Sequence, residues 1–336
     1  MAKRRINDQQ QRRIQNLHKK RLEKAGKNQQ QKSEQLSHQG LGPEQSGQVI
    51  TNYGQTLLVE DQHKSLYRCV ARQNLGAIVS GDRVIWQAAT ENEGVIVAVE
   101  ERESLLKKPG FGGKLKPMAA NINQIVIVSA VEPAPKPYLI DRYLVAAENL
   151  PATPIILINK IDLLTDENRD AIDKLVNNYE AIGYRVISAS KVTDDGFDDL
   201  LSALTTHTSI FVGLSGVGKS SLINQLMPEL NIRVGELSEA SGEGTHTTTS
   251  STLYNLPCDG QLIDSPGVRD FGLWDTSAED ILYGFIEFRD YIGHCKFSNC
   301  SHEHEPGCAI LQAVEDNKIS QQRFDNYQKI VHEYAS

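Results

Sequence analysis

The spacing of hydrophobic positions changes along the chain and divides it into four regions. Residues 1–45 have almost no apolar positions and predict a disordered arm, because such a segment cannot bury enough surface to order itself. Residues 46–116 contain short apolar segments separated by glycine or polar turns. Residues 117–273 alternate buried runs with helical spacing, and residues 274–336 begin and end with helical spacing over 278–292 and 318–335.

The second region predicts an OB-type β-barrel that binds RNA. Its five β-rich segments in about seventy residues are the pattern of a small barrel of the oligonucleotide-binding type. They are residues 47–54, 55–61, 65–71, 82–88 and 93–101. Tyr53, Tyr67 and Trp86 have two interpretations: they are stacking faces for bases, or they belong to the core, as aromatic residues of small barrels more often do. The basic, glycine-rich residues 107–117 are expected to form a connector at the domain boundary.

The third region predicts a doubly wound, mainly parallel α/β sheet. Near-continuous apolar runs are typical of strands that are buried on both faces, and here they alternate with helical segments. The expected strands are residues 122–131, 154–160, 184–190, 209–212 and 261–264, and the expected helices are residues 137–150, 166–183 and 220–227.

A phosphate-binding loop lies between one of these strands and the following helix. GLSGVGKSS fits G-x-x-x-x-G-K-[ST], in which glycines let the backbone wrap a phosphate chain and the new helix presents its positive end. Lys219 is predicted to reach the outer phosphates during catalysis and Ser220 to ligate Mg²⁺, while a plain glycine-rich turn is the alternative. The loop residues are Gly213, Leu214, Ser215, Gly216, Val217, Gly218, Lys219, Ser220 and Ser221.

A guanine motif follows an earlier strand. Asn159, Lys160 and Asp162 stand at its carboxyl end, where ligands bind in such sheets. A carboxylate there can accept hydrogen bonds from N1 and N2 of guanine, whereas adenine offers no matching donors. Ser188-Ala189-Ser190, a turn after the next strand, is expected to close over the base from the other side.

Two switch segments come after the phosphate loop. Residues 242–249, GEGTHTTT, predict a mobile loop in which Thr248 or Thr249 turns a hydroxyl to Mg²⁺. In the sequence DSPG, Asp264 is predicted to hold Mg²⁺ through water and the Gly267 N–H to sense a γ-phosphate. Taken alone, DSPG is a turn about as often as a nucleotide motif.

The motifs are in an unusual order. Ordinary GTPases begin with the phosphate loop and end with the guanine motif, whereas here the guanine motif comes first. Cutting and rejoining the same sheet would leave every motif at its place in space. The sequence therefore predicts a circularly permuted P-loop GTPase domain over residues 117–273.

A metal site is predicted near the C-terminus. The spacing C-x4-C-x-H-x5-C supplies three thiolates and one imidazole, from Cys295, Cys300, His302 and Cys308. Four ligands form a closed tetrahedral set suited to one structural Zn²⁺, and a reduced, metal-free cluster is the alternative. The five cysteines are odd in number and three are crowded here, which favours a reducing cytoplasm over disulfides; Cys69 and Cys258 are expected to pack in the core.

The net charge of −8 conceals a basic N-terminus. Residues 1–40 contain eleven Lys and Arg against three Asp and Glu, a net of +8, so the remainder carries −16. The arm is suited to lie along a polyanion such as RNA, and a solvated tail without a role is the alternative. Neither a membrane helix nor a signal peptide is expected, and the chain is expected to be a cytoplasmic monomer.

Taken together, residues 46–330 resemble the RsgA (YjeQ) family of small-ribosomal-subunit-dependent GTPases. The resemblance implies partners in the small (30S) subunit and its rRNA, a role in late subunit maturation, and subunit-stimulated hydrolysis of GTP to GDP and phosphate. It implies that the guanine motif and phosphate loop hold the nucleotide with Mg²⁺, and that the C-terminal cluster holds zinc. His246–Thr249 match the family's HTTT segment, but Thr245 stands where many members have Arg or Gln.

The water-positioning group is left open by the sequence. Many GTPases place a glutamine after D-x-x-G, and this chain has Val268, which cannot hydrogen-bond water. His246 is the candidate within the chain, and contact with RNA or solvent is its alternative role. We also expect loss of the γ-phosphate to move the DSPG segment and to change the pose of the zinc module relative to the barrel, with GTP favouring subunit binding.

Two other functions fit parts of the sequence. A GTP-dependent metallochaperone also joins a phosphate loop to a cysteine cluster, but it needs an exchangeable metal, which a closed four-ligand site opposes. An RNA-binding module with a weak nucleotide site is the second alternative.

Overall fold

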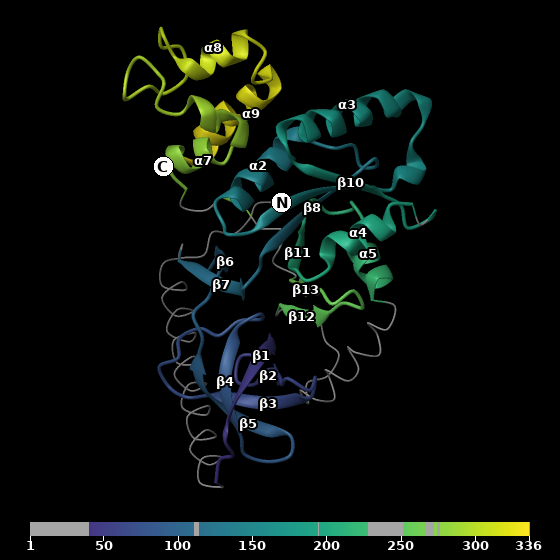
Figure 1. Cartoon of the computed structure of the whole chain (residues 1–336), viewed down its shortest axis with the longest axis vertical. Coiled ribbons are helices and arrows are strands. Elements are labelled where there is room, and N and C mark those ends of the chain that lie inside the picture. The colour runs from purple at the N-terminus through teal and green to yellow at the C-terminus, as the bar shows by residue number, and fades with distance from the viewer. Residues whose placement is uncertain are drawn as a thin grey trace, which may run out of the picture. The chain divides into compact units, whose positions relative to one another are not determined.

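The computed structural model describes residues 40–110, 114–193, 195–227, 251–265, 272–273 and 276–335, which form two compact units (Figure 1). The first unit comprises the described residues up to Arg102 together with Ser251 and Thr252, and the second comprises the rest. The predicted arm, apart from its last residues, lies outside the described residues. So do the predicted site residues His246, Thr248, Thr249 and Gly267.

The first unit is a five-stranded barrel, as predicted. Its strands are β1 (Glu44–Asn52), β2 (Leu57–Glu60), β3 (Leu66–Ala71), β4 (Arg83–Ala88) and β5 (Glu93–Val99). β1 pairs with β4 through its first half and with β2 through its second half, and β3 pairs with β5 in parallel. The order β1-β2-β3-β5-β4 therefore closes on β1, which is the arrangement of an OB-type barrel.

Two of the three aromatic residues named for the barrel belong to its core, whereas Tyr53 is half-buried outside the core cluster. Trp86 is fully buried among apolar residues, and the ring of the partly buried Tyr67 lies 4.4 Å from the Trp86 ring, centroid to centroid. Cys69 is fully buried in the same cluster, in agreement with its predicted packing role. The core interpretation is confirmed for Trp86, whose ring offers no face to a base.

The second unit is built on a sheet of order β10-β9-β8-β11-β13-β12. The members are β8 (Gln124–Ala130), β9 (Thr153–Asn159), β10 (Arg185–Ala189), β11 (Thr208–Val212), β12 (Thr252–Asn255) and β13 (Gln261–Asp264). All pairings from β10 to β13 are parallel. The apolar runs that predicted these strands are buried; every residue of β8, for example, is buried.

Helices cover both faces of this sheet, as expected of a doubly wound fold (Figure 1). α2 (Pro137–Glu148) and α3 (Asp166–Ile182) lie on one face, and α4 (Phe197–Leu204) and α5 (Lys219–Leu226) lie on the other. A 3-10 turn, η2 (Ile161–Leu163), follows β9. No helix among these described segments or the C-terminal ones is long and apolar enough to cross a membrane.

The expected connector over residues 107–117 is instead a β-hairpin. β6 (Leu105–Pro109) and β7 (Leu115–Ala120) pair antiparallel and form a sheet of their own. The prediction of a connector was wrong because Leu105, Leu106 and Met118–Ala120 give the two flanking segments strand character. The hairpin belongs to the second unit, which begins at Glu103 rather than near residue 117.

The C-terminal region packs against the same unit. Its elements are α7 (Ala278–Tyr283), η4 (Ile286–Tyr291), α8 (Ala309–Glu315) and α9 (Gln321–Tyr334). The single helix expected over 278–292 is divided near Gly284, where an added Cβ would lie 2.6 Å from Cγ1 of Val145. Glycine at this position allows the backbone to approach α2 closely, and the chain then turns into η4.

A buried ionic cluster joins α9 to three other elements. Arg323 donates to both carboxylate oxygens of Glu287 on η4, at 2.6 and 2.9 Å, and to Asp141 on α2, at 2.7 Å. Asn326 and the Tyr179 hydroxyl, on α3, also donate to Asp141 at 2.6 and 2.5 Å. Since Asp141 is fully buried, this cluster fixes the C-terminal region to the helices α2 and α3.

Candidate nucleotide and zinc sites

The predicted nucleotide motifs meet at one edge of the sheet. β9 ends at Asn159, β11 ends one residue before Gly213, and β13 ends at Asp264. These strands run parallel, so their carboxyl ends share an edge although Asn159 and Asp264 are 105 positions apart. The phosphate loop follows β11, which has β8 on one side and β13 on the other.

Two positions of the phosphate loop admit only glycine. Gly213 has a φ of +141°, and a Cβ there would lie 2.2 Å from the Val128 carbonyl oxygen. Gly218 has a φ of +96°, and a Cβ there would lie 2.3 Å from Nδ2 of Asn159. These close approaches bring the loop against the ends of β8 and β9, which shapes a concave backbone.

The loop retains the donors that a phosphate chain requires. Among the described residues, the backbone N–H groups from Leu214 to Gly218 donate no hydrogen bond to another backbone carbonyl. α5 begins directly afterwards at Lys219 and adds the positive end of a helix. Successive free N–H groups ahead of a helix N-terminus form a concavity that favours anions, so the loop fits a phosphate group.

Lys219 is folded onto the loop. Its Nζ donates to the carbonyl oxygens of Gly213 and Leu214, at 2.8 and 2.7 Å. Ser220, the predicted magnesium ligand, and Ser221 are exposed in the first turn of α5. The ammonium group therefore lies at the loop, within reach of anything bound there.

The guanine motif is bonded to the phosphate loop. Nδ2 of Asn159 donates to the Val217 carbonyl at 2.8 Å, and Nζ of Lys160 donates to the carbonyls of Gly216, at 2.7 Å, and Glu132, at 2.6 Å. Asn159 is 3% exposed, and its Oδ1 atom has no partner among the described groups. A buried acceptor without a partner fits a site that a ligand donor completes.

Asp162 is oriented by Ser190, the last residue of the turn that was predicted to close over the base. The Ser190 hydroxyl donates to Oδ1 of Asp162 at 2.5 Å and accepts from the N–H groups of Val192 and Thr193, at 3.0 and 3.3 Å. Among the described residues, the side chain of Ser188 on β10 is exposed and makes no hydrogen bond with Asp162, while Ala189 is fully buried. The available signal was position alone: Ser190 is the first residue beyond β10.

Asp264 completes the described part of the site. Desolvation by the surrounding chain raises the pKa of its carboxyl group, while the Ser265 N–H and the charge of Lys219 act in the opposite direction. Since β13 pairs in parallel with β11, Asp264 at the end of β13 lies at the same sheet edge as the phosphate loop that follows β11. A carboxylate and the Ser220 hydroxyl are oxygen ligands of the kind that Mg²⁺ prefers, so the described residues fit this ion.

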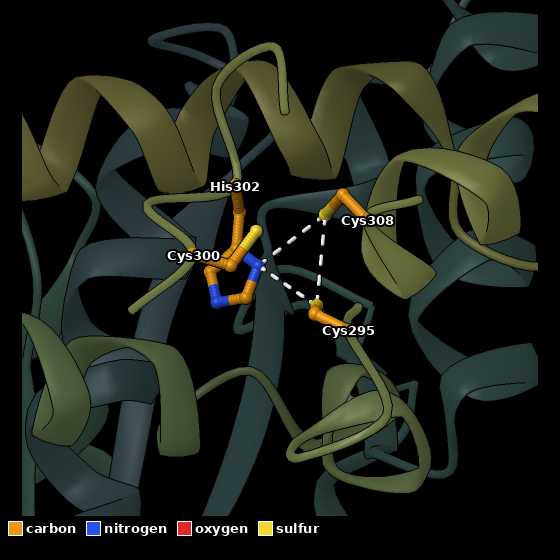
Figure 2. Close-up of side chains that lie close together, drawn as sticks. All are labelled: Cys295, Cys300, His302 and Cys308. Carbon is orange, nitrogen blue, oxygen red and sulfur yellow. Dashed lines mark hydrogen bonds between the residues drawn. The ribbon is translucent and has the colours of Figure 1, made fainter. Parts of the chain in front are cut away.

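The four predicted zinc ligands converge on one point, as Figure 2 shows. Their ligand atoms all lie within 4.8 Å of one another. Cys295 Sγ is 3.8 Å from Cys308 Sγ, and His302 Nδ1 is 3.5 and 3.4 Å from these two sulfur atoms. Tetrahedral bonds of about 2.3 Å to sulfur and about 2.0 Å to nitrogen imply separations of about 3.8 and 3.5 Å, so the cluster fits zinc.

Neighbouring groups hold these ligands in place. The N–H groups of Ala309 and Leu311 donate to the sulfur atoms of Cys295 and Cys308, at 3.4 and 3.5 Å, so Cys308 also caps α8. Burial lowers the pKa of His302, which favours the neutral imidazole that binds metals.

The loop between the ligands is organised by Glu305. Its carboxylate accepts from the N–H groups of Ser301, Glu303 and His304, at 2.7, 3.0 and 3.2 Å, and from the Ser301 hydroxyl at 2.5 Å. These donors hold the pKa of Glu305 well below its usual range. The sequence spacing identified the ligands but gave no sign of this supporting carboxylate.

Comparison with known proteins agrees with both sites. The sequence model of the RsgA GTPase family matches residues 99–274. The chain is 48% identical over 334 residues to the small ribosomal subunit biogenesis GTPase RsgA of Hahella chejuensis, covering 98% of this chain and 96% of that relative. The chain belongs to the RsgA GTPase family. It is therefore a GTP-hydrolysing enzyme, and the predicted family resemblance is confirmed.

Other relatives agree with this assignment. The RsgA protein of Pseudomonas aeruginosa strain PAO1 is 48% identical over 331 residues, which is 98% of each chain. The crystal structure of YjeQ from Thermotoga maritima is 32% identical with a TM-score of 0.73, covering 87% of this chain and 98% of that one. YloQ, described as a circularly permuted GTPase, is 31% identical with a TM-score of 0.71, covering 87% and 95%. The permuted fold predicted from the motif order is thus confirmed.

Proposed function

We propose that this GTPase binds the small ribosomal subunit and hydrolyses GTP to GDP and phosphate during the late maturation of that subunit. The observation that carries the nucleotide part is the bonding of the guanine motif to the phosphate loop, through Asn159 with Val217 and Lys160 with Gly216. The ribosomal part is supported by the names of relatives that align over 98% of this chain. We further propose that the chain acts in the cytoplasm as a monomer.

In this proposal different residues bind the phosphates, the base and the magnesium ion of the nucleotide. The N–H groups of residues 214–218 and the ammonium of Lys219 bind the phosphates. Asp162, held by Ser190, accepts from the guanine ring, and Asn159 supplies its unpartnered oxygen nearby. Ser220 and Asp264 hold Mg²⁺, which neutralises phosphate charge when bound. Thr248, Thr249 and Gly267 keep the switch roles predicted from the sequence.

Catalysis in this proposal depends on subunit binding. Val268 cannot orient water, so turnover by the chain alone is expected to be slow. His246 is the proposed water-positioning group, and contact of its loop with rRNA is the proposed means of ordering it. His246→Ala should abolish subunit-stimulated turnover and spare nucleotide affinity, whereas retained stimulation would refute the role.

In this proposal the zinc cluster stabilises the fold of the C-terminal region. Four protein ligands leave no open position for a substrate or for metal transfer. A metallochaperone would release its metal to a mild chelator, whereas we expect this chain to retain zinc under the same treatment.

The proposed function is tested by GTP turnover with and without purified small subunits. We expect little hydrolysis by the chain alone and a large increase on addition of subunits, with no increase on addition of large subunits. Turnover that does not respond to small subunits would contradict the proposal.

A further inference from the structure

The three cysteines of the zinc cluster are not equally covered. Cys308 is 3% exposed, and its sulfur accepts an N–H group of α8. Cys295 is partly exposed, and its sulfur accepts another N–H group of the same helix. Cys300 is also partly exposed, and it reaches the cluster from the loop between the other two, beside His302 (Figure 2). Of the three, Cys300 is therefore the sulfur that a small molecule from solvent can reach away from the helix.

The loop that carries Cys300 depends on the cluster for its shape. Residues 293–308 contain no helix or strand, and Ser298, Asn299 and Ser301 are exposed. The ligand His302 has a φ of +62°, a conformation that residues other than glycine seldom adopt. Loss of the metal would remove the bonds that hold His302 in this conformation, so the loop would then open.

Each sulfur of the cluster has another sulfur close by. All ligand atoms lie within 4.8 Å of one another, so a disulfide, with its S–S bond of about 2.05 Å, needs only a small shift. Metal-bound cysteines are deprotonated, and the thiolate is the reactive form. An accessible thiolate with a second thiol beside it is the arrangement of redox-sensing cysteines. Cys258 is partly exposed as well, but it lies outside the cluster.

We propose that the zinc cluster is an oxidation-sensitive switch, in which a peroxide joins Cys300 to Cys295 in a disulfide and the zinc ion is released. Cys295 is the expected partner because Cys308 is buried and caps α8. The remaining ligands, Cys308 and His302, are too few to hold a structural zinc ion. Disulfides of cytosolic proteins are usually transient, which suits a reversible switch in the proposed cytoplasmic location.

The chemistry consumes one molecule of peroxide. The Cys300 thiolate attacks one oxygen of hydrogen peroxide, the O–O bond breaks, and hydroxide leaves as the sulfenic acid forms. The Cys295 thiolate then attacks the Cys300 sulfur, the S–O bond breaks, and a second hydroxide leaves. The two sulfurs lose two electrons in total, and these electrons reduce the peroxide to two hydroxide ions.

The switch leaves the rest of the unit folded. Arg323 binds Asp141 and Glu287 without help from the cluster, and it holds α9 and η4 to α2. Oxidation should therefore open the zinc loop and α8 but spare the nucleotide site. Phe297 on this loop is 43% exposed, so opening the loop changes a surface that is offered to the small subunit. Only this last consequence rests on the proposed function.

The oxidation is tested on the full zinc-loaded chain with hydrogen peroxide. Released zinc is measured with a chromogenic chelator, and disulfides are mapped by mass spectrometry of the digested chain. We expect the zinc ion to be released together with formation of a Cys295–Cys300 disulfide, and dithiothreitol with added zinc should reverse both changes. Zinc that is retained, or that is released without this disulfide, would overturn the proposal.

The role of Cys300 is tested by Cys300→His. The variant keeps four ligands, since two cysteines and two histidines also hold structural zinc, but it lacks the accessible thiolate. It should retain its zinc at a peroxide concentration that empties the unaltered chain, whereas the control Cys258→Ser should release zinc as the unaltered chain does. Equal rates of release from Cys300→His and the unaltered chain would overturn the role of Cys300.

A second measurement covers the case in which Cys300→His does not bind zinc. Dimedone, which reacts with sulfenic acids, is added to the unaltered chain together with the peroxide. The label should appear on Cys300 before any other cysteine of the cluster. A label that appears first on Cys295 or Cys308 would overturn the proposed order of attack.

The switch itself is tested by comparing the oxidised and the untreated chain. GTP affinity, measured by calorimetry, should be unchanged, while affinity for small subunits should be lost and then restored by dithiothreitol with zinc. Unchanged subunit affinity after zinc release would overturn the switch. If the untreated chain does not bind small subunits, the proposed function is wrong, and zinc release and disulfide mapping still decide the oxidation chemistry.

Discussion

The zinc cluster and the nucleotide site are assembled in opposite ways. The zinc ligands come from fourteen consecutive residues, and their atoms already lie at the separations of a tetrahedral site. The nucleotide site draws on segments 105 positions apart, and it keeps an unpartnered Asn159 oxygen and a Lys219 side chain bonded to its own loop. The zinc cluster is closed and fixed, whereas the nucleotide site is open and is completed only by its ligand.

The difference indicates a division of labour. A closed four-ligand site stabilises a fold and does no chemistry, whereas an open site with free donors changes when its ligand binds or leaves. The cluster around Arg323 fixes the zinc-containing region to α2 and α3 of the nucleotide-binding sheet. Mobility that responds to the nucleotide is therefore expected in the loops at the sheet edge, and not between the zinc region and the sheet.

The largest effect is expected from Cys308→Ser. The substitution removes a ligand and the cap of α8, and structural zinc sites contribute on the order of 10 kcal/mol to folding. The zinc content should fall from one ion per chain to none. The backbone amides of α8 and of the loop before it should lose their protection from hydrogen exchange. Cys258→Ser is the control, and it should keep the ion. A folded C-terminal region without zinc would contradict the structural role given to the zinc cluster.

Arg323→Met is expected to have the next largest effect. It leaves Asp141 and Glu287 buried without their cation, which costs about 3–5 kcal/mol of unfolding free energy. Arg289→Met breaks a partly exposed pair with Glu148 and should cost only about 1 kcal/mol. Denaturant unfolding of both variants checks the difference. Similar losses would show that the cluster does not fix the zinc region.

Gly218→Ala should act on nucleotide binding. An alanine Cβ at this position would clash with Asn159, and the backbone has a positive φ. The resulting strain of about 1–3 kcal/mol corresponds to a loss of as much as about 100-fold in GTP affinity. Gly183→Ala has a positive φ as well, but nothing lies within 4 Å of its Cβ and it is the C-cap of α3. The control should lose some stability and keep its GTP affinity by calorimetry; unchanged affinity in Gly218→Ala would contradict the assigned loop geometry.

Ser190→Ala should have the smallest effect. It removes one hydrogen bond to Asp162, worth about 1 kcal/mol or about fivefold in guanine nucleotide affinity. Ser188→Ala, two residues earlier and exposed, should have no effect. A larger loss in Ser188→Ala than in Ser190→Ala would contradict the role given to Ser190.

The parts that the sequence predicted are those with a local or periodic signal. The zinc ligands follow from spacing within one short segment, and the sheet follows from apolar runs such as residues 124–130. The permuted order was visible because each motif carries its own pattern. Joining the motifs into one site needed only the rule that parallel strands share their carboxyl ends.

The parts that the sequence did not predict depend on partners distant in the chain. Arg323 resembles any solvated arginine of a helix until Asp141 and Glu287 are packed against it. Ser190 was expected in the turn near the base, but its bond to Asp162 depends on packing across the sheet edge. The hairpin β6–β7 was concealed by the glycines in the sequence between its strands. Tertiary contacts, rather than local preference, decided each of these.

The most direct test of the account is the affinity of the full chain for small ribosomal subunits, measured with a non-hydrolysable GTP analogue and with GDP. The open nucleotide site is proposed to control subunit binding through the segments at the sheet edge. We therefore predict tight binding with the analogue and weaker binding with GDP, at the same salt concentration. Equal affinities in the two nucleotide states would contradict the account.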